Sequence, residues 1–110
     1  MLGSVRTRSE FSQLRANGDV RRSGPIRVRF TSSAADGPLV AFAVSRRVGN
    51  AVVRNRLRRQ LREHLRHLEA FGHLLPGLYL VTIQPEAVGL EGTQLRGHLD
   101  DALRRVHPES

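Results

Sequence analysis

Hydrophobic positions recur with a helical period in the middle of the chain. They fall at steps of four, four, four, three and three, at Val53, Leu57, Leu61, Leu65, Leu68 and Phe71. This period places all six within an arc of roughly 120° on a helix. Asn50 is suited to cap the helix, and Gly49 permits the turn before it. The pattern therefore predicts a helix of roughly 20 residues that follows Asn50 and buries one face.

Other stretches show the patterns of strands. Residues 26–30 alternate between apolar residues and arginine, which predicts a strand with one apolar and one basic face. The runs 39–44 (LVAFAV) and 78–83 (LYLVTI) are apolar throughout, which is consistent with strands covered on both faces. A further short strand is expected near Val20.

Two more helices are predicted near the ends of the chain. Ser9 as N-cap, Glu10 in the first turn and Gly18 as a stop indicate a helix that places Phe11 and Leu14 on one side. Thr93 is expected to cap the last helix. Its apolar face is formed by Leu95, Leu99, Ala102, Leu103 and Val106.

These elements fit one α+β domain over residues 1–110, because a chain of 110 residues is too short for two independent cores. The order helix, strand, strand, strand, helix, strand, helix predicts a two-layer α/β sandwich. Helices would pack on one side of a mixed four-stranded sheet and leave the other face partly open. We expect residues 1–8 and 107–110 to be flexible.

Charge changes the interpretation of the central helix. The net charge is +8 and the pI about 11.7, and all 18 basic residues are arginine. Eight of these arginines lie between Arg46 and Arg66, where Glu63 is the one acid. At the helical period, one side of the helix carries Asn55, Arg59, Arg62 and Arg66, and the flanks of the apolar arc carry Arg54, Arg58 and Arg56.

An arginine face almost without acids favours a polyanionic partner, and a nucleic acid is the first choice. Guanidinium groups bind phosphate with two parallel hydrogen bonds, and the N–H groups after Gly49 lie at a positive helix end. The alternatives are a merely solvated face and, for the absence of lysine, genomic composition. Because a solvated face usually mixes both signs, the clustering favours phosphate contact.

The remaining chemistry is sparse. Without cysteine there is no disulfide, thiolate nucleophile or cysteine-based zinc site. His64 and His67 are one turn apart, but no third metal ligand is evident, and Asp100 and Asp101 diverge on a helix. No spacing indicates a Ser–His–Asp set, so we expect no catalytic residue and no metal ligand.

No apolar run could span a bilayer and no signal-peptide core is present, which favours a soluble cytoplasmic protein.

The run SRRVGNAVVRNRLRR from Ser45 to Arg59, continued by Arg62, resembles the protein subunits of bacterial ribonuclease P. The resemblance implies a left-handed crossover through the central helix. It implies a partner, one catalytic RNA per protein, with which the subunit forms a ribonucleoprotein endonuclease that removes the 5′ leader of precursor tRNA. In that hydrolase the RNA and Mg²⁺, which is bound mainly through the RNA, carry the chemistry of tRNA processing.

The resemblance also assigns residues. The RNA-binding set is Arg46, Arg47, Asn50, Arg54, Asn55, Arg56, Arg58, Arg59, Arg62 and Arg66. Phe11 and Arg15 are assigned to a cleft for the single-stranded leader, although an aromatic on a short helix is more often part of the core. Family members often carry a second aromatic where this chain has Arg15, so a guanidinium plane or a phosphate contact would replace a stacking contact.

Two other functions fit parts of the pattern. A ribosomal or RNA-chaperone protein without a nuclease role would also be small and basic, and only the order of the motif argues against it. A stand-alone nuclease is disfavoured because no catalytic group is suggested by spacing.

Overall fold

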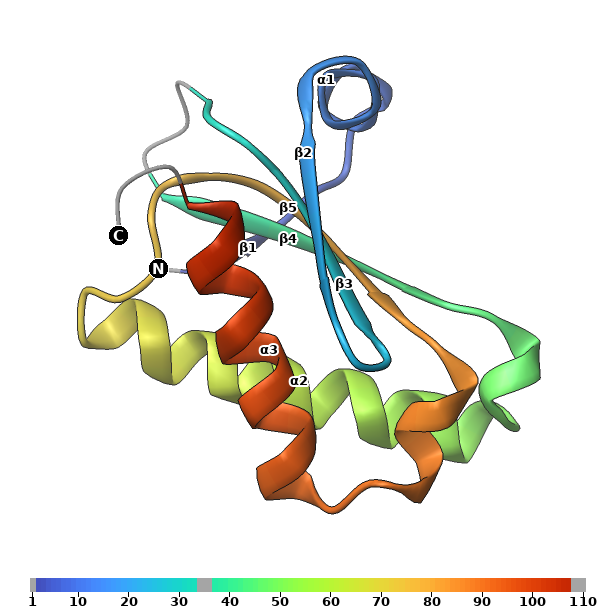
Figure 1. Cartoon of the computed structure of the whole chain (residues 1–110). Coiled ribbons are helices and arrows are strands. Elements are labelled where there is room, and N and C mark those ends of the chain that lie inside the picture. The colour runs from blue at the N-terminus through green and yellow to red at the C-terminus, as the bar shows by residue number, and fades with distance from the viewer. Residues whose placement is uncertain (1, 34–36, 108–110) are drawn as a thin grey trace.

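A computed structural model describes residues 2–33 and 37–107 of the chain. Along the chain the elements are β1 (Gly3–Ser4), α1 (Arg8–Asn17), β2 (Asp19–Ser23), β3 (Ile26–Thr31), β4 (Pro38–Val44), η1 (Arg46–Val48), α2 (Ala51–Ala70), β5 (Gly77–Ile83), η2 (Pro85–Gly89) and α3 (Gly92–Val106). Figure 1 shows the three helices arranged around one twisted sheet. The expectation of flexibility at Met1 and 108–110 concerns residues outside the described ranges.

The sheet has five strands in the order β1-β4-β5-β3-β2, rather than the four that the sequence predicted. β1 and β5 are parallel to β4, whereas β3 is antiparallel to both β5 and β2. The additional strand comes from a segment expected to be flexible. Val5 is 7% exposed and its N–H donates to the carbonyl of Val40 at 3.1 Å, so β1 is held against β4.

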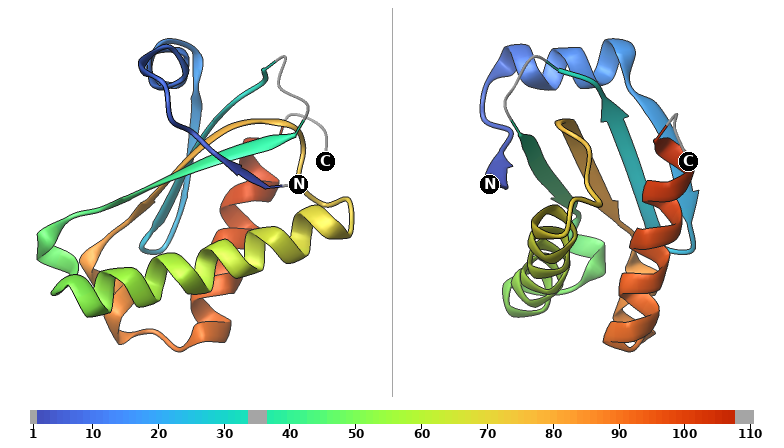
Figure 2. Two further views of the ribbon diagram at one scale, coloured as in Figure 1. Left: turned by 180° about the vertical axis from the view of Figure 1, so that it is seen from behind. Right: turned by 90° about the vertical axis from the view of Figure 1, so that its left-hand side faces the viewer.

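The helices occupy both faces of the sheet. On one face α2 and α3 cover the main core, which includes Val40, Tyr79 and Val81. On the other face α1 covers a smaller cluster around Leu14 and Leu78. Figure 2 shows α1 above the sheet and the two longer helices below it. The prediction that all helices pack on one side is therefore wrong for α1, because alternate residues of β5 point to opposite faces and both sets are apolar.

The connection from β4 through α2 to the parallel strand β5 is left-handed. Seen from the side of α2 with both strands pointing up, β5 lies to the left of β4 (Figure 2). Connections of this kind are right-handed in nearly all proteins. The structure thus has the unusual hand that the family resemblance implied.

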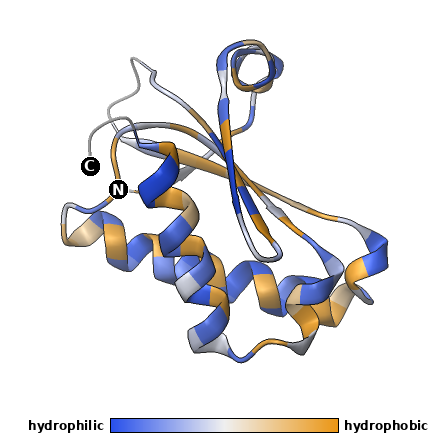
Figure 3. Cartoon of the chain, in the orientation of Figure 1, coloured by the Kyte–Doolittle hydropathy of each residue, from blue (hydrophilic) through white to orange (hydrophobic). Residues whose placement is uncertain are grey.

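The sequence predicts α2 almost to the residue. Asn50 is the N-cap, and its side-chain oxygen accepts from the N–H of Val53 at 3.0 Å. Leu57, Leu61 and Leu65 are buried, and Figure 3 shows hydrophobic and hydrophilic residues alternating along the helix. Phe71 is an exception, because it lies just beyond the last helical residue and is 66% exposed. Within the described residues, none of the helices is long and apolar enough to cross a membrane.

Candidate nucleic-acid interface

The basic turn before α2 is held in place by the main core. Val48 is 5% exposed and anchors the turn in the main core, while Arg46 and Arg47 beside it are exposed. Asn50 is also exposed, and its side chain caps the N–H of Val53. The two guanidinium groups of η1 therefore lie beside the positive N-terminal end of α2, which suits an anion.

The outer face of α2 is a row of solvent-exposed polar side chains. Arg56, Arg59, Arg66 and Asn55 are all exposed. Arg58, which is half-buried, donates a hydrogen bond from Nη1 to the side-chain oxygen of Asn55. This bond fixes the amide of Asn55 and leaves the three exposed arginines available to a ligand.

A second row runs along the flank of α2. Arg54, Arg58 and Arg62 are spaced four residues apart and are half-buried. Arg62 was predicted on the outer face, but its guanidinium carbon lies 5.2 Å from the ring centroid of Phe42 in β4. Burial, and then the charge of Arg66, lower the pKa of Arg62. The Nε of Arg54 is buried and has no hydrogen-bond partner among the described residues.

Carboxylates do not neutralise this surface. Between described residues, the ion pairs are His64–Asp100, Arg104–Asp101 and Arg105–Asp101. None of these pairs uses an arginine of positions 46–66. We call the ten side chains the α2 surface, namely Arg46, Arg47, Asn50, Arg54, Asn55, Arg56, Arg58, Arg59, Arg62 and Arg66. Its guanidinium groups are therefore free to meet an external anion.

The residues predicted for a leader cleft lie on the other side of the sheet. Phe11 is half-buried and packs against the cluster of Leu14 and Leu78, while Arg15 is exposed at the end of α1. Arg29 of β3 reaches α1, where its Nη1 lies 3.5 Å from the carbonyl oxygen of Leu14. Phe11 thus serves as a core residue and offers only part of its ring to a ligand.

Beyond α1 the same sheet face carries a polar row that crosses β2, β3 and β5 and ends at Ala43 of β4. In register, Arg22 pairs with Arg27, Arg27 with Thr82, and Thr82 with Ala43. An open cleft of about 500 Å³ adjoins this row at the ends of β4 and β5. It is lined by Ala43, Val44, Ser45, Arg47, Thr82, Ile83 and Gln84. Because Arg47 and Thr82 both line the cleft, the cleft connects the basic turn with the polar row of the sheet face.

Sequence patterns indicated part of this sheet face. The alternation of residues 26–30 places Arg27 and Arg29 on one face, as observed. Arg22 and Thr82 were missed, because only the strand register brings them beside Arg27. The one local signal that could have indicated Arg22 was that β2 and β3 are both rich in arginine and follow each other in the chain, which suggests that they pair.

The histidines of α2 have structural contacts. The Nε2 of His64 lies 2.7 Å from Oδ1 of Asp100 in α3, so His64 is a partly buried helix histidine. His67 stacks between His64 and Phe71. The described residues contain no group of three or more histidine or acidic side chains that could hold a metal ion.

One Ser–His pair is present although the sequence suggested none. The Ser23 hydroxyl lies 2.9 Å from Nδ1 of His98. A hydrogen bond from Ser23, and then the charges of Arg105 and Arg104, hold the pKa of the Asp101 carboxyl below its usual range. Ser23 is only 8% exposed, so its hydroxyl is not accessible as a nucleophile for a substrate.

Comparison with known proteins identifies the family. The sequence profile of the Ribonuclease P family matches residues 3–107. The chain belongs to the ribonuclease P protein family. Among proteins named ribonuclease P protein component, that of Thermobifida fusca is 46% identical over 70 residues, which are 63% of this chain and 46% of that protein. The Mycobacterium sp. (strain KMS) protein is 38% identical over 107 residues, covering 93% of this chain and 88% of that protein.

Solved ribonuclease P proteins have the same fold. That of Staphylococcus aureus has a TM-score of 0.83 at 21% identity and covers 93% of each chain. That of Thermotoga maritima has a TM-score of 0.82 at 21% identity and covers 94% of this chain and 97% of the other. The family thus has the mixed sheet and three helices described above.

Proposed function

We propose that the chain is the protein subunit of ribonuclease P and that it assists 5′ maturation of precursor tRNA. The α2 surface would bind the catalytic RNA, with one protein for each RNA. The observation that carries the proposal is a helix face of exposed arginines without ion pairs to described carboxylates, in a member of this family. Guanidinium groups in this arrangement suit phosphates of a folded RNA.

The proposal assigns the hydrolysis to the RNA. Surfaces dominated by arginine repel divalent cations, so Mg²⁺ would be bound mainly through RNA phosphates and not by this chain. The protein would then act by neutralising phosphates where the catalytic RNA folds back on itself and on its substrate. A cytoplasmic location remains an expectation.

The opposite sheet face would hold the single-stranded leader. Arg22 and Arg27 form its uncovered polar row, and Arg15 and Arg29 lie where that row meets α1. Leader bases could stack on guanidinium planes, and leader phosphates could pair with the same groups. Because Phe11 is half-buried, arginine contacts would dominate over aromatic stacking at this face.

Reconstitution tests the proposal directly. The protein alone should leave precursor tRNA intact, and it should stimulate cleavage by the matching catalytic RNA at low Mg²⁺ concentration. The variant Arg59→Ala should stimulate less, whereas Arg21→Ala, on the edge strand β2, is the matched control for loss of one charge. Failure of the wild-type protein to stimulate the RNA would refute the proposal.

A ribosomal or RNA-chaperone role is the second candidate, and family membership does not favour it. The two functions differ in what the protein binds. Co-sedimentation with ribosomal subunits, together with no binding to the catalytic RNA, would support the second role.

A further inference from the structure

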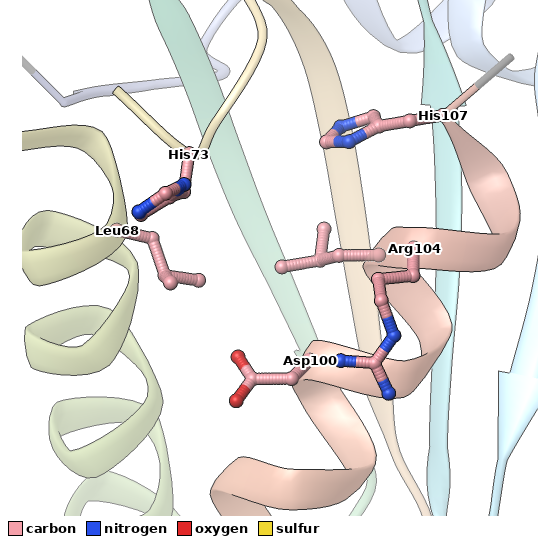
Figure 4. A pocket seen from close by; sticks show the side chains of 6 residues that line it. Leu68, His73, Asp100, Arg104 and His107 are labelled. Carbon is pink, nitrogen blue, oxygen red and sulfur yellow. The ribbon is translucent and has the colours of Figure 1, made fainter. Parts of the chain in front are cut away.

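A pocket of about 310 Å³ lies between the C-terminal half of α2 and α3, away from the α2 surface. It is lined by Leu68, His73, Asp100, Leu103, Arg104 and His107. Figure 4 shows Asp100 and His107 pointing from α3 towards Leu68 and His73 on the other side. This volume is at the lower end of the range for small-molecule sites, so the pocket suits one ring system rather than a segment of secondary structure.

The polar groups of the pocket have defined hydrogen-bonding roles. The Tyr79 hydroxyl donates to the carbonyl of Leu75 at 2.6 Å, so it must accept from Nε2 of His107, 2.8 Å away. Burial lowers the pKa of His107, so its ring is neutral and Nδ1 is left as an acceptor. His64 occupies Oδ1 of Asp100, which leaves Oδ2 as a second acceptor.

The two acceptors are seven residues apart on α3, which corresponds to about 10 Å along the helix. Between them lie the apolar side chains of Leu68 and Leu103. A ligand that fits would have a flat apolar body and hydrogen-bond donors at both ends. A ribonucleotide has this form, since an amino group of its base lies at one end and its ribose hydroxyls at the other.

An exposed pair of rings connects the pocket with the α2 surface. Phe71 is 66% exposed, and its ring centroid is 4.7 Å from that of His67. His67 follows Arg66 directly, and Phe71 comes three residues after Leu68. Bases of unpaired RNA can stack on an aromatic ring exposed to this degree.

We propose that this pocket binds the base and ribose of one unpaired ribonucleotide, and that the neighbouring base stacks on Phe71. The proposal rests on the function proposed above, because the RNA that reaches the pocket is the one held by the α2 surface. Arg66 and Leu68 both lie in the last turns of α2, so an RNA held at Arg66 would be close to the pocket. A protein side chain is the competing occupant.

Free nucleotides test the pocket without the catalytic RNA. The full chain is labelled at histidine and titrated with adenosine or guanosine 5′-monophosphate at constant ionic strength, and ring resonances are followed by NMR. Saturable shifts of His73 and His107 are expected, while His98, which contacts Ser23, should stay in place. Equal shifts with inorganic phosphate, or binding of N-acetyl-phenylalaninamide in place of nucleotides, would overturn the proposal.

Variants then connect the pocket with RNA affinity. Leu68→Trp fills the pocket, and Phe71→Ala removes the exposed ring without opening the core. Each should weaken binding of the catalytic RNA about five- to tenfold, whereas Val88→Ala, at an exposed apolar residue of η2, should not. Thermal unfolding confirms that each variant is folded.

The same measurements separate the two proposals. If wild-type protein does not bind the catalytic RNA, the proposed function fails, and the nucleotide titration still decides whether the pocket is a site. If Leu68→Trp and Phe71→Ala bind that RNA as wild type does while Arg59→Ala binds it weakly, the pocket proposal is wrong and the proposed function stands.

Discussion

At the scale of single residues, the arginines of α2 differ in what they touch. Arg59 is exposed to solvent, whereas Arg62 lies over the ring of Phe42. The difference follows from their angles around the helix, because Arg62 lies on the flank that faces β4. A solvent-exposed guanidinium can contribute only to RNA binding, whereas one that covers an aromatic ring also contributes to the stability of the fold.

Arg59→Ala and Leu61→Ala separate the two faces of α2. Arg59→Ala should weaken RNA binding and reduce the slope of log affinity against log salt by about 0.7 to 0.9, because one phosphate contact is lost. Its unfolding temperature should stay close to that of wild type. Leu61 is fully buried, so Leu61→Ala should lower the free energy of unfolding by about 2–5 kcal/mol. Equal destabilisation by both changes would contradict the assignment of faces.

Arg62 should behave differently from Arg59. Arg62→Gln should lower stability by about 0.5–1 kcal/mol, because the contact with Phe42 is lost, and should also weaken RNA binding. Phe42→Leu removes the same contact from the other side. A double-mutant cycle in chemical denaturation measures the coupling, and additive effects of the two changes would show that the contact contributes nothing.

At the scale of elements, α1 begins two residues earlier than the sequence pattern predicted, because a different residue caps it. The sequence suggested Ser9 as N-cap, but the helix is capped by Thr7. Its hydroxyl accepts from the N–H of Glu10 at 3.1 Å, and the Glu10 carboxylate accepts from the N–H groups of Arg6 and Thr7. Reciprocal bonds of this kind define a capping box, which fixes the first turn of the helix.

Thr7→Ala should therefore cost about 0.5–2 kcal/mol of stability, whereas Ser9→Ala should change it by less than about 0.5 kcal/mol. Thermal unfolding measures both, and hydrogen exchange shows whether the loss is concentrated in α1. A larger effect of Ser9→Ala would show that the helix begins where the sequence pattern placed it.

The same cap makes the stability of α1 depend on pH. Hydrogen bonds from the N–H groups of Arg6 and then Thr7 lower the pKa of Glu10 in the folded protein. The unfolded chain therefore takes up this proton first as the pH falls. The contribution of Glu10 is fully present above its unfolded pKa of about 4.3 and is lost as the pH falls through the folded value. Glu10→Gln should remove this pH dependence in acid unfolding.

The sequence predicted individual elements better than their arrangement. Period and capping located α2 because its signals are local, and the same pattern indicated Leu57, Leu61 and Leu65 as core. No local signal says which face of the sheet a helix covers, so α1 was placed on the wrong side. Phe71 continued the apolar period by one step beyond the helix end, where the period no longer determines burial.

The candidate site shows the same limit. Most positions of the α2 surface were predicted from the sequence, since they lie on one helix and the turn before it. Two positions differ from the expectation, because Arg62 lies on the flank over Phe42 and Arg56 is exposed on the outer face. The polar row of Arg22, Arg27 and Thr82 depends on strand register, and the pocket between α2 and α3 depends on tertiary packing. Neither the polar row nor the pocket produces a periodic pattern in the sequence.

At the scale of the whole molecule, the sheet separates two basic surfaces. The α2 surface lies on the side of the main core, and the row of Arg22 and Arg27 lies on the opposite face beside α1. They approach each other at the turn of Arg47, which also lines the cleft at the ends of β4 and β5. Under the proposed function, a catalytic RNA on the α2 surface and a leader on the sheet face would therefore meet at this turn.

This arrangement predicts that Arg59→Ala and Arg27→Ala have different and additive effects. Arg59→Ala should weaken assembly with the catalytic RNA to the same extent with or without substrate. Arg27→Ala should leave assembly unchanged and reduce the preference of the complex for precursor tRNA over leaderless tRNA, since the proposed function assigns the exposed Arg27 to the leader alone. Sites on opposite faces without shared partners should add within about 0.5 kcal/mol, which binding titrations of the single and double variants can resolve. A loss of assembly in Arg27→Ala would place both arginines on one RNA surface and contradict the two-surface arrangement.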